Sequence, residues 1–148
     1  LMVLEYPDWY FDRTQSVLIY PRPFQKRSTR LNIAPTISIT GQYVLAGETG
    51  YGQPVLLNWN DVQKGSRDDN DGSNLVIHEF AHQLDLINGP NADGLPPLPS
   101  EIDEKAWWQA FKDELEVACN WVEKGYQVLI DDYGLSSPSE FFAVSSEW

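Results

Sequence analysis

The residues best suited to chemistry in this chain are its two histidines, which stand four positions apart among 148 residues. They are His78 and His82, and Glu79 lies between them, so residues 78–82 read HEFAH and match the pattern H-E-x-x-H. On a helix, residues four apart lie one turn above each other, so both imidazoles project from one face with Glu79 beside them. Two neutral imidazoles at this spacing can bind zinc, and the carboxylate can take a proton from a zinc-bound water. The alternative is a chance string on an ordinary helix, but a chance match that includes the glutamate is rare.

The residues around this motif predict the required helix. Asp71 and Gly72 close a polar loop, Ser73 can serve as the N-cap, and apolar residues follow as far as Leu84. Because these apolar residues surround most of the helix, we expect it to be largely buried. Burying two histidines and a glutamate is costly unless they are paired or metal-bound, so the context supports a metal site.

Asp85 lies one turn beyond His82 on the same face of the predicted helix. It could orient a ligand histidine from behind, as metal-bound histidines usually require. The alternative is a carboxylate near the helix end that is solvated or caps a neighbouring loop. The sequence leaves both open.

A catalytic zinc usually has three protein ligands, and the third must be found elsewhere in the chain. No third histidine exists, and the only cysteine, Cys119, falls on the apolar side of a predicted helix, where we expect a buried, inert thiol. The arrangement that adds a third histidine and a Met-turn is excluded, because Asn88 occupies the ligand position and the sole methionine is Met2. The third ligand should therefore be a carboxylate from a later helix, as in thermolysin-like sites.

Two glutamates on the last predicted helix are candidates for that ligand. The pattern favours Glu140 over Glu147, because Glu140 lies in the first turn nearest the preceding loop. However, residues 137–140 (SPSE) also form a capping box, in which Glu140 would bond back to the N-cap amide. Glu147 could be a surface residue or a supporting partner of the site.

The elements that must position these residues change in type along the chain. Residues 47–54 could close a hairpin between the third and fourth predicted strands, and a helix over Ser100–Gly125 precedes the final helix, which begins at Ser137. Strands followed by helices, without alternation, predict an α+β domain. The predicted strands are Val17–Tyr20, Thr36–Ile39, Tyr43–Ala46 and Val55–Trp59.

Composition bounds the classes of function. The length suits a single domain over residues 1–148, and the formal net charge of −12 argues against nucleic acid or an anionic membrane as a partner. The chain contains no run of 18 apolar residues, so no membrane span is predicted. A single cysteine fits the cytoplasm. The chain begins at Leu1 instead of Met and stops at Trp148 inside a predicted helix, so we expect truncation at both ends.

Several strings together resemble one known family, the Mlc titration factor A-like bacterial zinc metallopeptidases. The resemblance extends from about Leu18 to the end of the chain, and the first and last of the main blocks are quite specific at this separation. These blocks are residues 77–85 (IHEFAHQLD), 88–89 (NG), 93–96 (DGLP) and 137–144 (SPSEFFAV), with further likeness at 46–48 (AGE) and 56–59 (LLNW).

The resemblance implies a role for each site residue. His78, His82 and Glu140 would bind zinc, Glu79 would be the catalytic base, and Tyr133, seven residues before Glu140, would stabilise the oxyanion. Without the resemblance, Tyr133 would be interpreted as a half-buried loop tyrosine. The family also implies a zincin-type fold, cytosolic location, aminopeptidase-like activity and binding to a transcriptional repressor of sugar uptake. Compared with the family, this chain lacks an N-terminal segment and ends shortly after the third ligand.

The sequence therefore predicts a zinc-dependent peptidase. Glu79 would deprotonate the zinc-bound water and pass the proton to the leaving amine, and the strand Val55–Trp59 is expected to be the edge that pairs with an extended peptide. The main alternative is a non-catalytic regulatory binding protein that keeps a zinc-stabilised fold, and a non-peptide amidase is a third. The intact Glu79 favours an enzyme, because a purely structural site does not need it.

Overall fold

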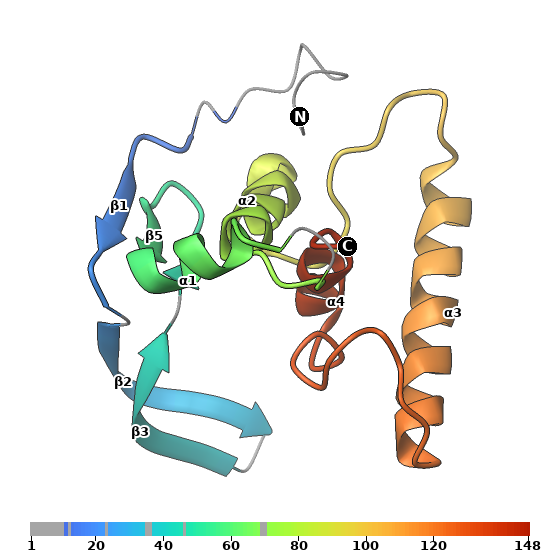
Figure 1. Ribbon diagram of the computed structural model, residues 1–148. Coiled ribbons are helices and arrows are strands. Elements are labelled where there is room, and N and C mark those ends of the chain that lie inside the picture. Colours follow the sequence, from blue (N-terminus) through green and yellow to red (C-terminus); the bar gives the residue numbers. More distant parts are fainter. Residues whose placement is uncertain (1–10, 12, 23, 35–36, 46, 69–70) are drawn as a thin grey trace.

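The computed structural model describes residues 11, 13–22, 24–34, 37–45, 47–68 and 71–148. In these residues strands come first and helices follow, so the α+β class predicted from the sequence is confirmed (Figure 1). The strands are β1 (Val17–Tyr20), β2 (Phe24–Ala34), β3 (Ile37–Leu45), β4 (Gly47–Glu48) and β5 (Val55–Asn58). The helices are α1 (Trp59–Gly65), α2 (Leu75–Asp85), the 3-10 turn η1 (Leu86–Asn88), α3 (Glu104–Glu123) and α4 (Pro138–Ser145).

A small sheet lies beside the helices, in the order β1-β5-β4. β5 is its central strand, parallel to β1 and antiparallel to β4, and its residues Val55 and Leu57 are buried. The prediction that Val55–Trp59 forms a free edge is therefore wrong, because β5 is hydrogen-bonded on both sides. The last residue of the predicted strand, Trp59, begins α1 instead.

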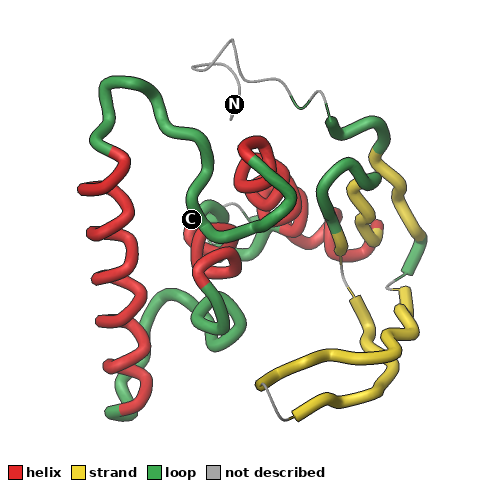
Figure 2. Tube along the Cα trace, turned by 180° about the vertical axis from the view of Figure 1, so that it is seen from behind, coloured by secondary structure: helices red, strands yellow, loops and turns green. Residues whose placement is uncertain are grey.

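A second sheet consists of β2 and β3 alone, paired antiparallel and extending away from the helices (Figures 1 and 2). The hairpin predicted between Tyr43–Ala46 and Val55–Trp59 is wrong, because β3 pairs with β2 while β5 pairs with β4. The predicted strands at 36–39 and 43–46 are parts of one strand, although Thr36 and Ala46 themselves lie outside the described residues. β2 contains the polar run KRSTR and lacks the alternation that marks a strand, so its pairing was hidden from the sequence.

Helix α2 packs against β4, β5, α1 and α4 and contributes to the core of the molecule. Every residue of α2 is buried or half-buried, as the apolar pattern predicts. Its N-cap is Asn74 instead of Ser73, since the Asn74 side chain accepts hydrogen bonds from the amides of Val76 and Ile77. The fully or nearly buried apolar residues of the described chain are Val55, Leu57, Ala81, Leu86, Phe141, Ala143 and Val144.

Helix α3 stands at one side of the molecule (Figures 1 and 2). It begins after its N-cap Asp103, later than the predicted start, and none of its residues is buried. The apolar side of α3 touches α4 through Phe111, whose ring centroid lies 5.1 Å from that of Phe141. This apolar side is thus half-buried, and so is Cys119, which was expected to be buried. No helix in the described part of the chain has the length and apolar character to cross a membrane.

Candidate metal centre

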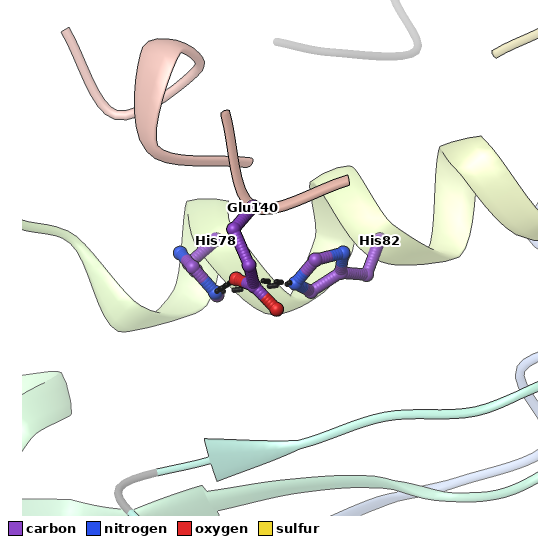
Figure 3. A group of neighbouring side chains, drawn as sticks. All are labelled: His78, His82 and Glu140. Atoms are coloured by element: carbon purple, nitrogen blue, oxygen red, sulfur yellow. Dashed lines mark hydrogen bonds and ion pairs between the residues drawn. The ribbon is translucent and has the colours of Figure 1, made fainter. Parts of the chain in front are cut away.

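Three side chains from two helices converge on one point (Figure 3). His78 and His82 project from the same face of α2, and Glu140 comes from the first turn of α4. The two Nε2 atoms lie 3.2 Å apart, and each lies 3.3 Å from Glu140 Oε2. The structure thus brings together the three residues that the resemblance implies as metal ligands.

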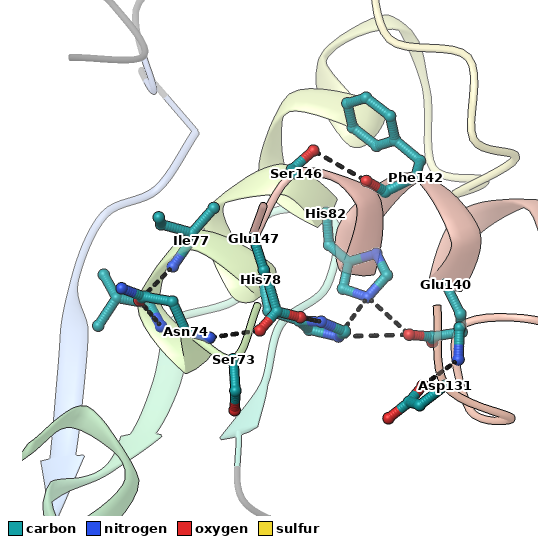
Figure 4. A network of polar contacts seen from close by, with 12 residues as sticks. Ser73, Asn74, Ile77, His78, His82, Asp131, Glu140, Phe142, Ser146 and Glu147 are labelled. Atoms are coloured by element: carbon teal, nitrogen blue, oxygen red, sulfur yellow. Dashed lines mark hydrogen bonds and ion pairs between the residues drawn. The ribbon is translucent and has the colours of Figure 1, made fainter. Parts of the chain in front are cut away.

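The other nitrogen of each imidazole has its own partner (Figure 4). His78 Nδ1 lies 2.8 Å from Glu147 Oε1, and His82 Nδ1 lies 3.1 Å from Ser139 Oγ. A carboxylate can only accept a hydrogen bond, so the proton of His78 belongs on Nδ1, which leaves the Nε2 lone pair facing the site. With the same tautomer at His82, the site brings three lone pairs together and needs a cation between them.

The spacing of these three atoms fits a tetrahedral metal ion. Ligands about 2.0–2.2 Å from a metal in tetrahedral geometry are about 3.3–3.6 Å from one another, close to the observed 3.2 and 3.3 Å. Glu140 Oε2 is also buried, and among the described residues no group donates to it a hydrogen bond of standard geometry. The residues present can therefore hold a metal ion, with Glu140 Oε2 as one donor.

Without a metal, a proton on His78 balances the negative charge that Glu140 brings to the site. Burial alone would lower the pKa of His78, but hydrogen bonds to Glu140 and Glu147 raise it to about 9. Burial would raise the pKa of Glu140, but its close polar contacts with the two histidines lower it to about 2. A metal ion that binds here must therefore displace a proton from His78.

Glu79 lies beside this group without being part of it. It is 5 % exposed, and burial raises the pKa of its carboxyl to about 7, although the two histidines act in the opposite direction. Gly47 of β4 presses against it, since a Cβ atom added to Gly47 would overlap the Glu79 carboxylate. A carboxyl group with a pKa near neutrality is suited to accept and return a proton.

Tyr133 lies at the open side of the site, on the loop between α3 and α4. It is 58 % exposed, and its ring centroid lies 6.0 Å from that of His78. Side-chain hydrogen bonds within the loop run from the Gly134 amide to Asp131 Oδ1 and from Ser136 Oγ to the Tyr133 carbonyl. Loss of water around its hydroxyl, followed by the negative charge of Glu140, raises the pKa of Tyr133, which therefore stays a neutral donor.

The two glutamates of the last helix have different surroundings. The Glu140 amide donates to Ser137 Oγ at 3.2 Å, so half of the predicted capping box forms, while the Glu140 carboxylate points to the histidines instead of the N-cap. The Glu147 side chain is 9 % exposed and accepts hydrogen bonds from His78 and from the Asn74 amide. Glu147 is therefore a supporting partner of the site, and the surface alternative is wrong.

Sequence reasoning left Asp85 open and missed Ser139. Asp85 is completely buried and its Oδ2 accepts a hydrogen bond from the Gly94 amide at 2.9 Å, so it caps the neighbouring loop, as one alternative predicted, and it is not solvated. Ser139 is 8 % exposed and contacts His82, and its only signal was its position next to the candidate ligand Glu140. A serine carries too little chemical distinction to be singled out by such a position.

A cavity of about 600 Å³ opens beside His78 and Glu79. Its walls combine acidic and apolar side chains with Tyr133 and a single lysine, Lys64, and the cavity is large enough for substrate side chains. The acidic and apolar lining residues beyond the site are Asp61, Asp71, Leu75, Leu129, Asp131, Val144 and Trp148.

A His-His-Glu group on two helices, with a buried glutamate beside it, is a donor set typical of metallopeptidase-like proteins. In agreement, residues 1–148 match the family described as glucose-regulated metallo-peptidase M90, and the chain belongs to this family. It is 35 % identical over 154 aligned positions to Mlc titration factor A of Yersinia enterocolitica serotype O:8 and of Escherichia coli O1:K1. Each match covers the whole chain but 55 % of the relative, so the chain spans about half the length of these relatives. The resemblance identified in the sequence is confirmed.

Proposed function

We propose that this chain is a zinc-dependent peptidase with a zincin-type fold and aminopeptidase-like activity. The observation that supports this most strongly is the meeting of His78 Nε2, His82 Nε2 and Glu140 Oε2 at tetrahedral spacing beside the buried Glu79. Family membership supports the same class of enzyme. A metal site kept only for stability would not require a carboxyl group with a pKa near neutrality next to it.

Zinc is the proposed metal because two imidazoles and one carboxylate are a common catalytic zinc set that leaves one position open. When bound, zinc polarises a carbonyl group and lowers the pKa of a coordinated water. The proposed ligands are His78, His82 and Glu140. Glu147 and the serine before Glu140 would hold the imidazole rings in place.

The protein's own residues would then carry the proton transfers. Glu79 would take the proton of the attacking water and deliver it to the leaving amine, because its pKa of about 7 suits both steps. Tyr133, with its raised pKa, would donate a hydrogen bond to the oxyanion. Its position on an exposed loop would allow a small closure over the substrate.

The peptide would pair with β4 instead of β5. β4 lies beside Glu79 through Gly47, and in the described residues β5 is its only partner strand. An extended peptide can add to such an edge through main-chain hydrogen bonds. The missing side chain at Gly47 would let the scissile bond approach the Glu79 carboxylate closely.

Partner and location are carried over from the relatives as proposals. The name of the relatives, Mlc titration factor A, suggests that this chain also binds the transcriptional repressor Mlc. A cytoplasmic location is proposed because the family resemblance implies it. The alternative of a non-catalytic binding protein rests on the same name. The chain spans 55 % of the length of those proteins, so the surface that binds the repressor need not lie within residues 1–148. The single-domain organisation of residues 1–148 stays a prediction.

Glu79→Gln tests the proposal, because it removes the base while preserving the shape of the side chain. We expect zinc content to stay at one ion per chain and peptide turnover to fall about 10²–10⁴-fold. Glu101→Gln, at an exposed position, is the matched control and should keep full turnover. A library of peptides with free and with blocked N-termini would separate aminopeptidase from internal cleavage. Full turnover in the Glu79→Gln variant, or no turnover in the zinc-loaded wild type, would remove the proposed mechanism.

A further inference from the structure

The two histidines of the metal centre are supported in different ways. His78 Nδ1 bonds directly to a carboxylate, that of Glu147, whereas His82 Nδ1 meets only the hydroxyl of Ser139 at 3.1 Å. A hydroxyl can accept this hydrogen bond, but it still has its own hydrogen to donate. Because Ser139 is 8 % exposed, that hydrogen needs an acceptor within the protein.

Asp85 is placed to be this acceptor. It is completely buried, and its Oδ2 already accepts a hydrogen bond from the Gly94 amide. Its second oxygen, Oδ1, is buried and has no hydrogen bond of standard geometry from the described residues. Burial raises the pKa of Asp85, while Gly94 and the Ser139 hydroxyl favour its charged form, so Ser139 lies within electrostatic reach of the carboxylate.

Asp85 also connects α2 to the start of α4 by a second route. Gly94 has φ +81°, a conformation that favours glycine, and a Cβ atom added there would overlap the carbonyl oxygen of Pro138. The loop that donates to Asp85 is therefore packed against the first residue of α4. Ser139 and the proposed ligand Glu140 follow immediately in the chain.

We propose that Asp85 is a positioning residue of the metal centre, which orients His82 through the Ser139 hydroxyl and fixes the first turn of α4 through Gly94. The His82 Nδ1 hydrogen is donated to Ser139 Oγ, and the Ser139 hydrogen is donated to Asp85. The inference rests on the metal site of the proposed function, but it does not require that the site be catalytic.

Zinc affinity of the full chain, measured by competition with a chromophoric chelator, tests this chain of hydrogen bonds. Ser139→Ala and Asp85→Asn should each weaken zinc binding about 10–100-fold, the usual effect of losing a support behind a metal ligand. The double variant should be no weaker than Asp85→Asn alone, because both changes break the same chain. Asp113→Asn is the matched control: this exposed carboxylate of α3 accepts from Gln109 Nε2 and should not affect affinity.

Two further measurements separate positioning from general stability. Thermal unfolding of the metal-free Ser139→Ala variant should show a cooperative transition at a slightly lower temperature, because the buried partners of the hydroxyl lose a hydrogen bond. The absorption spectrum of its cobalt-substituted form should shift because the His82 ring is less constrained. Wild-type affinity in both single variants, or additive losses in the double variant, would overturn the proposal. If Asp85→Asn does not fold, Ser139→Ala decides alone: a loss of about tenfold or more supports the proposal, and no loss overturns it.

The outcome is distinguishable from failure of the proposed function. A wild-type chain that binds zinc but cleaves no peptide would end the proposed function, while the affinity losses could still be measured and would still support the role of Asp85. A wild-type chain that binds no zinc would overturn both.

Discussion

Helices α3 and α4 have similar sequence patterns but differ in how deeply they are buried. Both begin at a side-chain N-cap, at Asp103 and Ser137, and both carry aromatic residues. Yet the long helix α3 buries none of its residues, whereas the short helix α4 buries Phe141, Ala143 and Val144 against the rest of the molecule. Helix length and amphipathic pattern therefore do not tell which helix belongs to the core.

The difference follows from what each helix contacts. α4 packs on α2 and places Glu140 against two histidines, whereas α3 contacts α4 through the ring of Phe111 and buries none of its residues. The region where α2 meets α4 thus combines buried apolar residues with buried polar ones. Its buried polar residues on α2 and α4 are His78, Glu79, Gln83, Asp85 and Ser139.

The largest contrast is expected for a glutamate removed from each helix. Glu140→Ala should weaken zinc binding by more than the roughly 10–100-fold typical of a supporting residue, because it removes a proposed ligand. Glu116→Ala, at an exposed position of α3, should leave zinc binding unchanged. Metal content after dialysis and chelator competition would measure both, and equal zinc affinities would contradict the assignment of Glu140.

An aromatic residue removed from each helix should separate them in stability. Phe141→Ala should lower the free energy of unfolding by about 3–5 kcal/mol, because a buried ring is lost and a cavity remains. Trp121→Ala on α3 should cost roughly 0.5–1 kcal/mol, since this ring is 51 % exposed and lies beside the ring of Tyr126. Urea unfolding of the metal-free proteins would measure both values, and similar costs would show that α3 is better packed than its exposure indicates.

Two tyrosines that follow α3 allow a comparison within exposed segments. Tyr133→Phe should lower kcat on the order of a hundredfold with little change in KM or zinc content, because only the transition state uses the phenol. Tyr126→Phe removes the same hydroxyl from a residue that is 62 % exposed and should have no effect. If kcat is unchanged by Tyr133→Phe, this tyrosine is an ordinary loop residue.

The smallest expected effects are changes of stability with pH, which arise because the pKa values of Asp61 and Asp85 are shifted in opposite directions. Hydrogen bonds from Lys64 and Asn58 lower the pKa of Asp61, so its stabilising contribution is present above about pH 4 and is lost as the pH falls through its folded pKa. Because Asp61 and Lys64 form a partly exposed pair, we expect at most about 1 kcal/mol. Burial raises the pKa of Asp85, so the wild type should lose stability as the pH rises from about 4 toward the folded pKa.

The unfolding free energies of Asp61→Asn and Asp85→Asn, measured against the wild type in chelator between about pH 3 and 7, would test these signs. The advantage of the wild type over Asp61→Asn should grow with pH, and its standing relative to Asp85→Asn should decline. A common direction for the two variants would contradict the assigned shifts.

The α+β class, the metal-site helix and the last helix could be predicted because their signals are local. The strand Val17–Tyr20 and the N-cap Ser137 were predicted at the observed positions. Sheet pairing could not be predicted, because the partner of β5 depends on contacts distant in sequence and β2 has no apolar alternation. The burial of α3 was overestimated because periodicity identifies an apolar face without showing what covers it.

The candidate site was predictable to the extent that its residue types are distinctive. His78, Glu79 and His82 follow from one motif, but the choice between Glu140 and Glu147 needed the orientation of two side chains that lie on the same helical face. The contact between Ser139 and His82 joins residues 57 positions apart, and a serine gives no sign of such a contact. The roles assigned to these residues stay predictions until metal and activity are measured.

The residues from Pro138 to Glu147 do more than provide the proposed ligand Glu140. Ser139 supports His82, Glu140 faces both histidines, and Glu147 supports His78, so this short segment completes every part of the centre that α2 begins. Any fluctuation that lifts the segment from α2 would remove all three contacts in one event. Bound metal and the docked segment should therefore stabilise each other, so that slower amide hydrogen exchange in α4 and slower release of the ion report the same opening.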